Sequence, residues 1–554
     1  MRGTFTVWAL LASGCVIEPE KIDDPTDGPP VPGATGDTGL PDVDNDEDGF
    51  PASVDCNDDD PLINPDAVEA CDGIDNDCST VADDGDGVAS IAQADAAELY
   101  ATLDDAIADA IEAPGTIIDV CPGPVTVGSF TLDEGDSFTI SGIAGRAETT
   151  LTVESNLTLA TLQDDADLTL ANLTVSGSIQ RAFVLEDAST LTIRDAVVSG
   201  HTGGGVLVAE GSEGVTLNIQ GSTFENNVVA GRGGAILAEG RAFDINVEPS
   251  DNHPSRFASN GANEGGAIAL VNRAGAQLPN RKVTMSGDVG IELNTAVESG
   301  GAIYAEVGTL DFDQVTFANN AATDLGGAID LAISSFVTAS ETVFRNNEAD
   351  VGAAIAMDAF GLSLLSGTGD DVSIVDNVAI QAGGGISGGG FVSGVTLARN
   401  QAGIGGAVHV PSGAFLTLES VAFDANLGIQ GGALYCSDDT DVDVLDSALT
   451  LNEAVPQFFQ SQGGGLPPIA LPIPESVELE YASLGGAAFV GSGAELQATN
   501  TDFGIDLSAD GGVDNDNRPG DVFVRAFEPD ANHEQFDGVA DVLCTDAGCT
   551  LITP

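Results

Sequence analysis

The residues with the clearest chemical potential are acidic side chains near the start of the chain, between positions 44 and 55. Aspartates stand at positions 1, 3, 5 and 12 of this stretch: Asp44, Asp46, Asp48 and Asp55. Alternate carboxylates turn toward one point when the backbone bends at position 6, where Gly49 stands. Phe50 at position 7 can add its backbone carbonyl. Because oxygen ligands at this spacing suit a hard cation, we predict a Ca²⁺-binding loop.

The stretch that follows extends the acidic pattern and adds cysteines. It reads DCNDDDPLINPDAVEACDGIDNDC and ends at Cys78. Residues 42–78 closely resemble the MopE-type metal-binding motif of bacterial surface proteins, with its Cys-Asp-Gly and Asp-Asn-Asp-Cys blocks. The resemblance implies further metal ligands among the later aspartates: Asp58, Asp60, Asp72, Asp75 and Asp77. The family usually continues with Asp-Gly, whereas Ser79 and Thr80 stand here, which puts a ligand at that point in doubt.

The cysteines predict disulfides, because an exported protein enters an oxidising compartment. Two bridges can form among four cysteines whose pairing the sequence leaves open: Cys56, Cys71, Cys78 and Cys121. Cys544 and Cys549 can close a small loop near the end of the chain. Cys436 is then left over, and we expect it to be a buried structural thiol.

The first residues have the pattern of an export signal. Arg2 precedes an apolar run that ends in Leu-Ala-Ser-Gly before Cys15. This pattern resembles a bacterial lipoprotein signal, which is cut before a cysteine that becomes lipidated; an ordinary secretion signal is the alternative. The resemblance implies export in a Gram-negative bacterium, with the cell surface or outer membrane as destination and outer-membrane lipid held through acylated Cys15. Residues 15–41 are rich in Pro, Gly, Asp and Thr and predict a flexible tether.

The charge of the chain limits its partners. The formal net charge is −73, from 88 acidic and 15 basic residues. Binding to nucleic-acid phosphates needs a basic face, so this composition excludes nucleic acid as a partner. A strongly acidic surface keeps a protein soluble and attracts divalent cations.

The rest of the chain is organised by a repeated pair of motifs. Nine times an apolar residue is followed three positions later by asparagine: Phe224/Asn227, Phe257/Asn260, Ile291/Asn294, Phe317/Asn320, Phe344/Asn347, Ile374/Asn377, Leu397/Asn400, Phe423/Asn426 and Leu449/Asn452. Gly-rich steps follow and end in an apolar residue 8 or 9 positions after the asparagine: Ile236, Ile268, Ile303, Ile329, Ile355, Ile386, Val408 and Leu434. Repeats of this size with strand-like alternation predict a solenoid whose units bury their apolar faces against each other.

The predicted fold class is all-β, a single-stranded right-handed parallel β-helix of the pectate-lyase type. Stacked asparagines should pair their side-chain amides and accept left-handed backbone at the corners, while the phenylalanines stack inward. The amphipathic stretch 99–112 predicts a helix that caps the first rung. The predicted domains are a signal peptide (1–14), the tether (15–41), the metal-binding module (42–90), the β-helix (91–502) and a C-terminal cap (503–554).

The paired motifs carry a second resemblance. Over residues 203–452 they are similar to the FxxN and GGAI repeats of the chlamydial polymorphic outer-membrane proteins, which are surface β-helices linked to adhesion. We therefore expect a lipid-anchored surface protein with a structural, adhesive or ligand-binding role. Its expected partners are an extracellular glycan or another surface protein. A polysaccharide lyase or glycoside hydrolase is the alternative, because β-helices also carry such enzymes.

The sequence shows no recognisable catalytic constellation for that alternative. Arg345 and Arg399 lie beside turn asparagines, where we expect salt bridges to the acidic surface. The histidines are dispersed, and we expect them at the surface or in turns: His201, His253, His409 and His533. The sequence therefore leans against an enzyme and leaves the question open.

Overall fold

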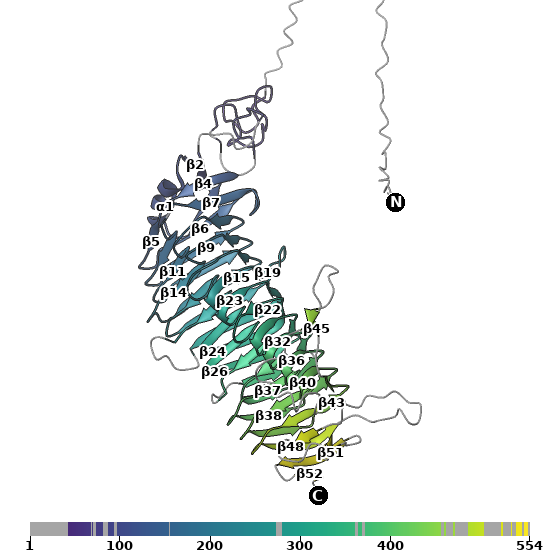
Figure 1. Ribbon diagram of the computed structural model, residues 1–554. Coiled ribbons are helices and arrows are strands. Elements are labelled where there is room, and N and C mark those ends of the chain that lie inside the picture. Colours follow the sequence, from purple (N-terminus) through teal and green to yellow (C-terminus); the bar gives the residue numbers. More distant parts are fainter. Residues whose placement is uncertain are drawn as a thin grey trace, which may run out of the picture.

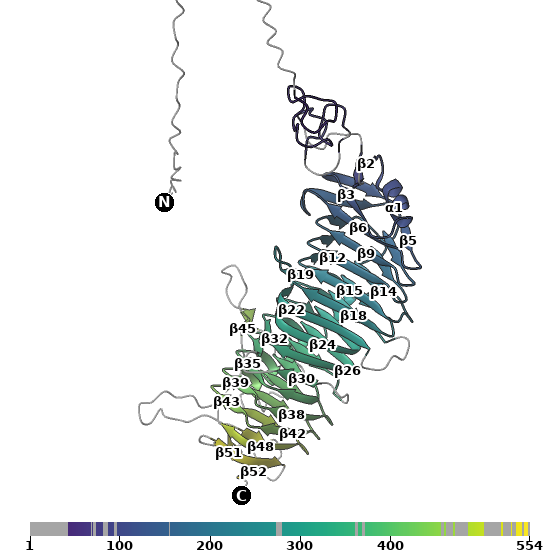
Figure 2. The same ribbon diagram turned by 180° about the vertical axis from the view of Figure 1, so that it is seen from behind.

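The computed structural model describes most of the chain between residues 43 and 551. The described residues are 43–67, 69, 74–80, 87–92, 97–154, 156–272, 280–359, 364–367, 372–455, 459–460, 469–470, 486–502, 522–524, 533–534, 539–545 and 548–551. The predicted signal peptide, the tether and Cys15 lie outside them. The strands stack into one long rod of about twelve turns, seen from two sides in Figures 1 and 2.

Each turn contributes strands to as many as four columns, and within a column neighbouring strands pair in parallel. The first column contains the Gly-rich steps: β5 (Phe130–Leu132), β8 (Ala160–Leu162), β11 (Phe183–Leu185), β14 (Val206–Val208), β17 (Ile236–Ala238), β21 (Ile268–Leu270), β29 (Ile355–Met357), β33 (Ile386–Ser387), β37 (Val408–Val410), β41 (Leu434–Cys436), β47 (Ala488–Val490) and β49 (Val522–Val524). The second column follows it along the chain: β3 (Thr116–Val120), β6 (Ser137–Gly142), β9 (Asp167–Ala171), β12 (Thr190–Arg194), β15 (Val215–Gln220), β18 (Phe243–Glu248), β30 (Leu364–Gly367), β34 (Gly390–Ser393), β38 (Phe415–Glu419), β42 (Asp441–Leu445) and β48 (Glu495–Asp502).

The third column carries the apolar residues that precede the asparagines: β4 (Gly123–Val127), β7 (Thr149–Val153), β10 (Thr174–Ser176), β13 (Val197–Ser199), β16 (Thr223–Glu225), β19 (Ser255–Ala258), β27 (Val343–Arg345), β31 (Val372–Val375), β35 (Val395–Ala398), β39 (Ala422–Asp424) and β43 (Ala448–Thr450). Three long strands pass through more than one of these columns: β22 (Arg281–Glu292), β24 (Ile303–Ala318) and β26 (Ile329–Ser340). The fourth column is a separate eight-stranded sheet: β20 (Gly261–Glu264), β23 (Thr295–Ser299), β25 (Ala321–Ala322), β28 (Glu348–Val351), β32 (Val378–Ala382), β36 (Gln401–Ile404), β40 (Leu427–Gln430) and β44 (Glu453–Ala454).

Inward-facing apolar side chains form one continuous core along the rod. Strand residues alternate between buried and more exposed positions, as the pleat of a strand requires. The predicted inward phenylalanines stack between turns: ring centroids are 4.6 Å apart for Phe317 and Phe344, and 5.4 Å apart for Phe224 and Phe257. The prediction of an all-β parallel β-helix is therefore confirmed.

Buried asparagines form a continuous hydrogen-bonded ladder along one corner of the rod, from Asn227 to Asn452. In each link the side-chain amide donates to Oδ1 of the next asparagine at 2.9–3.1 Å. The same amide also donates to a backbone carbonyl, which is Ile291 for Asn320. His201 continues the ladder beyond Asn227 and lies in a turn as expected, but it is fully buried.

The left-handed backbone of this corner belongs to the residue before each ladder asparagine. These residues have φ between 53° and 60°: Asn226, Ser259, Leu293, Asn319, Asn346, Asp376, Arg399, Ala425 and Leu451. The expectation that the ladder asparagines themselves take this conformation is therefore wrong. The ladder side chain must point inward to reach its neighbours, so the sharp turn falls on a residue that points out; Leu293 is 54% exposed.

The Gly-Gly steps are required by the close stacking of turns. Gly300 has φ of +66°, which L side chains rarely adopt. At Gly301 a Cβ atom would lie 2.0 Å from the carbonyl oxygen of Gly327 on the next turn. The first glycine therefore permits the turn, and the second permits the approach of the neighbouring backbone.

Both ends of the rod are closed by non-repeating structure. At the N-terminal end the hairpin of β1 (Ala89–Ala92) and β2 (Ala97–Tyr100) pairs antiparallel to β3, and helix α1 (Leu103–Ile111) packs its apolar face on the core. This helix is shorter than the predicted 99–112, because β2 extends to Tyr100 and Thr102 caps the helix by accepting the N–H of Asp105.

At the other end the hairpin of β51 (Val539–Thr545) and β52 (Gly548–Leu551) pairs antiparallel to β48. The predicted Cys544–Cys549 disulfide joins its two strands. Two further short pairings complete the strands: β45 (Phe459–Gln460) pairs with β46 (Ile469–Ala470), and β50 (His533–Glu534) with β49. Cys436 is free and buried, as expected.

Replacing Asn320 with alanine should open the ladder locally. The change removes the acceptor of two buried N–H groups of Asn294 and the side-chain donor to the Ile291 carbonyl, at about 1–3 kcal/mol for each buried group left unsatisfied, while Asn347 Oδ1 keeps the backbone N–H of residue 320. We expect the backbone amides of the adjoining turns to exchange about 100-fold faster, measured by hydrogen exchange. The exposed Asn319, replaced by glycine, is the matched control, since its left-handed backbone suits glycine. Equal acceleration in both variants would contradict the role of the ladder.

Candidate metal centre

Five aspartates of the N-terminal module share one hydrogen-bonding arrangement: Asp44, Asp46, Asp48, Asp55 and Asp58. One carboxylate oxygen of each accepts a backbone N–H from within the module at 2.8–3.2 Å. The N–H of Gly49 donates to Asp44, and the N–H of Asn45 donates to Asp58, thirteen residues further along the chain. The acidic stretch is thus held in shape by its own carboxylates.

The other oxygen of each of these carboxylates is buried and has no hydrogen-bond partner: Asp44 Oδ1, Asp46 Oδ2, Asp48 Oδ2, Asp55 Oδ2 and Asp58 Oδ2. Ligand oxygens of Asp44, Asp46 and Asp48 lie within 4.8 Å of one another, and so do those of Asp46, Asp55 and Asp58. Unpaired buried acceptors cost free energy, whereas cations bound at these two groups, which share Asp46, would satisfy them. The residues present therefore fit a bound metal ion.

The electrostatics of the group also favour a cation. Burial raises the pKa of Asp46, and the negative charges of Asp48, Asp55 and Asp44 act in the same direction, while a hydrogen bond from the Asp48 backbone opposes them. Crowded carboxylates without a counter-charge disfavour their own ionised form. A positive ion at the centre reverses that effect, since it favours the charged form of each ligand.

The remaining predicted ligands are placed differently. Asp60 stands apart from the convergent oxygens, and its Oδ1 accepts the N–H of Leu62 at 3.2 Å. Asp72 lies outside the described residues. The carbonyl role predicted for Phe50 stays a prediction.

Asp75 and Asp77 form a second acidic group, together with a residue that sequence reasoning missed. Glu69 is 4% exposed, and its ligand oxygen lies within 4.8 Å of those of Asp75 and Asp77. Its Oε1 also accepts the N–H of Asp77 at 2.8 Å. A contact that spans eight positions leaves no local spacing pattern, so only the excess of acidic residues could have pointed to Glu69.

A disulfide holds the two acidic groups together. Cys56 next to Asp55 is bonded to Cys78 next to Asp77, with a Cα–Cα distance of 5.7 Å. Cys121 is also disulfide-bonded, and Cys71 lies outside the described residues. Because the thiolate is the form of cysteine that binds metals, the bonded sulfurs leave metal binding here to the carboxylates.

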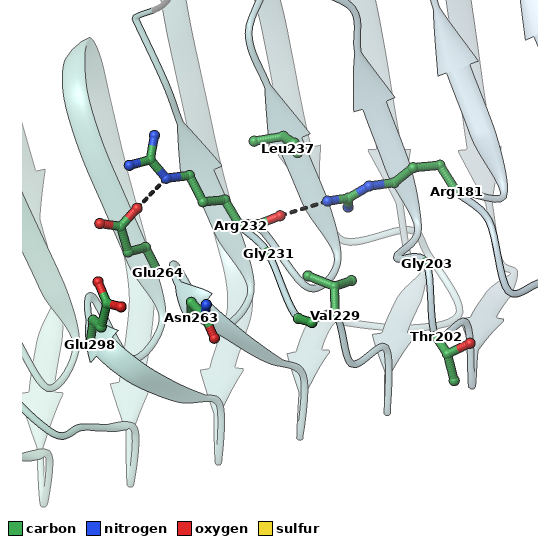
Figure 3. A pocket seen from close by; sticks show the side chains of 11 residues that line it. Arg181, Thr202, Gly203, Val229, Gly231, Arg232, Leu237, Asn263, Glu264 and Glu298 are labelled. Atoms are coloured by element: carbon green, nitrogen blue, oxygen red, sulfur yellow. Dashed lines mark hydrogen bonds and ion pairs between the residues drawn. The ribbon is translucent and has the colours of Figure 1, made fainter.

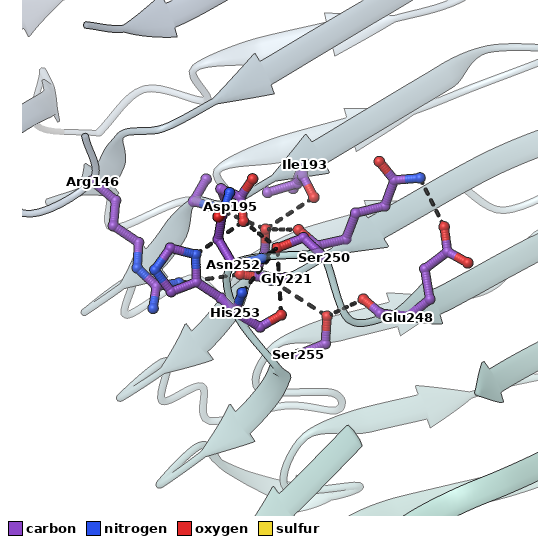
Figure 4. Close-up of polar contacts among 12 residues, drawn as sticks. Arg146, Ile193, Asp195, Gly221, Glu248, Ser250, Asn252, His253 and Ser255 are labelled. Carbon is purple, nitrogen blue, oxygen red and sulfur yellow. Dashed lines mark hydrogen bonds and ion pairs between the residues drawn. The ribbon is translucent and has the colours of Figure 1, made fainter. Parts of the chain in front are cut away.

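The solenoid places a serine, a histidine and an aspartate in contact, as Figure 4 shows. His253 Nδ1 lies 3.0 Å from Asp195 Oδ1, and the hydroxyl of Ser250 donates to the same carboxylate oxygen. A nucleophilic serine would instead donate to the imidazole. Ser250 also accepts the N–H groups of Asn252 and His253, so these contacts fix a turn.

Two further titratable side chains of the solenoid, Arg399 and His409, have structural partners. The guanidinium of the exposed Arg399 donates to both oxygens of Asp376 at 2.8 Å, which confirms the salt bridge expected for it. His409 is held between the hydroxyls of Ser387 and Ser437, at 2.9 and 3.1 Å, and burial lowers its pKa to about 4. A neutral histidine of this kind joins three successive turns.

One carboxylic acid of the solenoid is almost completely buried. Asp330 in β26 is 4% exposed and lies in register beside Tyr304 of the preceding turn. Burial raises the pKa of Asp330 to about 7, and the charges of Glu264 and Asp358 act in the same direction against a hydrogen bond from Ser299. The solenoid therefore holds a proton on this side chain close to neutral pH.

The fold and the site together define a class of protein: a parallel β-solenoid preceded by a small disulfide module with a carboxylate metal centre. Two comparisons agree with this description. Residues 55–84 match the MopE family named "Putative metal-binding motif", whose label mentions copper. Residues 221–239 and 314–331 match the Chlamydia polymorphic membrane protein repeat. Both resemblances seen in the sequence are thereby confirmed.

These matches cover short parts of the chain. No curated protein and no solved structure matches it. Within the described residues, no helix has the length and apolar character needed to cross a membrane.

Replacing Asp330 with asparagine should make stability less dependent on pH. The pKa of Asp330 is raised from 3.8 to about 7 in the folded chain, so its contribution to stability is fully present below about pH 4 and is lost as pH rises through 7. We expect the gain in Tm of Asp330→Asn over the parent to grow from pH 4 to 7 and then level off. The exposed Asp324, changed to asparagine, is the control. A gain independent of pH would contradict the assignment.

Proposed function

We propose that this protein is a calcium-stabilised, lipid-anchored rod on the surface of a Gram-negative bacterium, with a structural or adhesive role. The observation that carries the proposal is the set of five buried, unpaired carboxylate oxygens, on residues that form two groups sharing Asp46, in a module preceding a parallel β-solenoid. The matches to a bacterial metal-binding motif and to a surface-protein repeat support a surface location.

Calcium is the ion that the ligand chemistry favours. The convergent ligands are carboxylate oxygens, which suit hard cations such as Ca²⁺, whereas copper selects imidazole and sulfur ligands. Ca²⁺ takes six to eight oxygens in a flexible arrangement, and the three aspartates of each group leave room for a backbone carbonyl such as that of Phe50 or for water. The second group of Glu69, Asp75 and Asp77 has the same chemistry.

The ion would stabilise the folded module as well as offset the negative charge of the carboxylates. Among the described residues between 43 and 80, Ile63 is the one buried hydrophobic side chain, with 6% of its surface exposed. A module with so little apolar core needs a metal or a disulfide to be stable, and Cys56–Cys78 supplies one of these. We infer that the cation supplies the other.

The surface role follows from how the parts would be joined. Cys15 would carry the lipid, residues 15–41 would span the distance from the membrane, and the closed ends of the rod would prevent its strands from pairing with other rods. A stack of parallel turns bound by the asparagine ladder is stiff, so it can hold a binding surface away from the cell. Extracellular glycans and other surface proteins are the partners within reach of such a rod.

Asp46→Asn should weaken calcium binding more than any other single change, because Asp46 belongs to both groups of convergent oxygens. We expect Ca²⁺ affinity to fall at least about tenfold, or about 1.4 kcal/mol, by calorimetry on the chain from residue 16 onward. Asp59→Asn, an exposed neighbour, should leave it unchanged. Tighter binding of Cu²⁺ than of Ca²⁺, unaffected by Asp46→Asn, would contradict calcium as the ion.

Cys15→Ser should release the protein from the membrane. Without an acyl chain the remaining contacts are those of a very acidic, soluble rod, so we expect the variant in the soluble fraction and the parent with detergent-extracted lipids. Mass spectrometry of the parent should show acyl groups on Cys15, and Cys436→Ser should retain them. A parent that carries no acyl mass would contradict the anchor, and cells that lose surface adhesion with Cys15→Ser would support the adhesive role.

A further inference from the structure

The eight-stranded fourth column begins abruptly within the rod. From Asn227 to Ile236 the corner takes nine residues, whereas the equivalent corner of the preceding turn, from His201 to Val206, takes five. The preceding turn is therefore four residues too short to contribute a strand to this sheet. The segment 228–232, hereafter the edge strand, is bridged in parallel to β20 at Val228–Gly261 and Arg232–Glu264 and bends at Ala230 and Gly231.

The backbone of this edge strand is only half satisfied. Val229 donates to Gly261, and Asn263 donates to Gly231, so alternate residues bond to β20, while Val228 on the other side donates to the His201 carbonyl of the preceding turn. Because hydrogen bonds alternate between the two sides of a strand, Ala230 and the N–H of Arg232 face the other way. In the described part of the chain, neither the N–H of Ala230 nor that of Arg232 takes part in a hydrogen bond. Ala230 and Gly231 are exposed.

A cavity of about 590 Å³ lies beside this edge. It is lined by Arg181, Thr202 and Gly203 of the shorter turns at one end and by Asn263, Glu264 and Glu298 of β20 and β23 at the other, as Figure 3 shows. Arg181 reaches two turns along the rod and donates to the carbonyls of Arg232 and Gly233, at 2.6 and 2.5 Å. This arginine closes one end of the edge and leaves the stretch at Ala230 open.

The charges around the cavity favour a positively charged occupant. Arg232 is paired with Glu264 and Glu306, and the guanidinium of Arg181 is satisfied by carbonyls. Glu298 lines the same cavity, is exposed and has no ion pair among the described residues. The net charge of −73 adds an attractive field for cations.

We propose that this edge binds an extended segment of another protein, about four residues long and carrying a lysine or arginine, which adds as a strand beside residues 229–232. Main-chain hydrogen bonds to Ala230 and Arg232 would supply affinity, and Glu298 would select the basic side chain. Strand addition of this kind needs unpaired edge groups with open space beside them, and the N–H groups of Ala230 and Arg232 and the adjoining cavity supply these. The proposal names a partner for the surface role, but its chemistry does not depend on the lipid anchor or on calcium.

The test is hydrogen exchange on the purified full-length chain with a synthetic peptide, acetyl-Lys-Val-Lys-Val-Lys-amide. At a peptide concentration about ten times Kd, exchange at Ala230 and Arg232 should slow about tenfold, while Val229, already bonded to Gly261, should not change. A peptide of the same sequence with N-methylated alternate amides should not bind. Absence of protection at 230 and 232, or equal binding of the methylated peptide, would overturn the proposal.

Charge selection is tested by one variant and its control. Glu298→Lys should weaken binding of the lysine peptide about tenfold and favour acetyl-Glu-Val-Glu-Val-Glu-amide, whereas Glu210→Lys on an exposed loop adds the same charge elsewhere. Equal effects of both variants would overturn the role of Glu298. Protection by neutral polysaccharide chains in place of peptides would show a glycan site and overturn strand addition. Neither result depends on whether the protein is anchored at a cell surface.

Discussion

The structure depends on the hydrogen bonds that each turn makes with the next. A ladder asparagine such as Asn347 donates to Asn377 and to the carbonyl of Phe317, and it accepts from Asn320, so its polar groups are satisfied only when both neighbours are in register. A shift of one turn by a single residue would bury unpaired amides along with misplaced phenylalanines. The ladder therefore sets register more strictly than apolar packing alone, and the variable loops must begin and end at its fixed corners.

Much of this could be predicted from sequence because the ladder leaves a fixed offset between residues. The spacing of Phe, Asn and Gly-Gly reflects contacts that repeat in each turn. The sequence pattern alone therefore predicts the inward phenylalanines of the core and the asparagines of the corner. It does not predict the position of the left-handed residue, because types as different as Leu293, Arg399 and Ala425 occupy it. What these residues share is an outward side chain, and outward direction is a property of the assembled corner rather than of local composition.

The metal centre also contains residues that a local sequence pattern predicts and residues that it does not. Asp44, Asp46 and Asp48 are recognisable because alternation along one short loop aims them at one point. Asp58 and Glu69 complete or extend the acidic groups only after the chain folds back, and no spacing rule describes that return. One cation can bind oxygens from residues that are distant in sequence and so hold the chain together there. Without the ion, many packed apolar side chains would be required for the same effect. The low apolar content of the module is consistent with an ion that takes the place of an apolar core.

The constraint that builds the rod also determines where it can bind. In a regular stretch of a parallel solenoid the backbone groups of each turn bond to the turns on either side, so such a stretch offers few main-chain groups to a partner. Unpaired groups arise where adjoining turns differ in length, and the step from a five-residue to a nine-residue corner before Ile236 is such a place. Arg181 covers the carbonyls of Arg232 and Gly233 there, which shows that the edge is partly protected, yet the N–H of Ala230 stays accessible. A discontinuity in repeat length is therefore the feature of this solenoid from which specific recognition can follow.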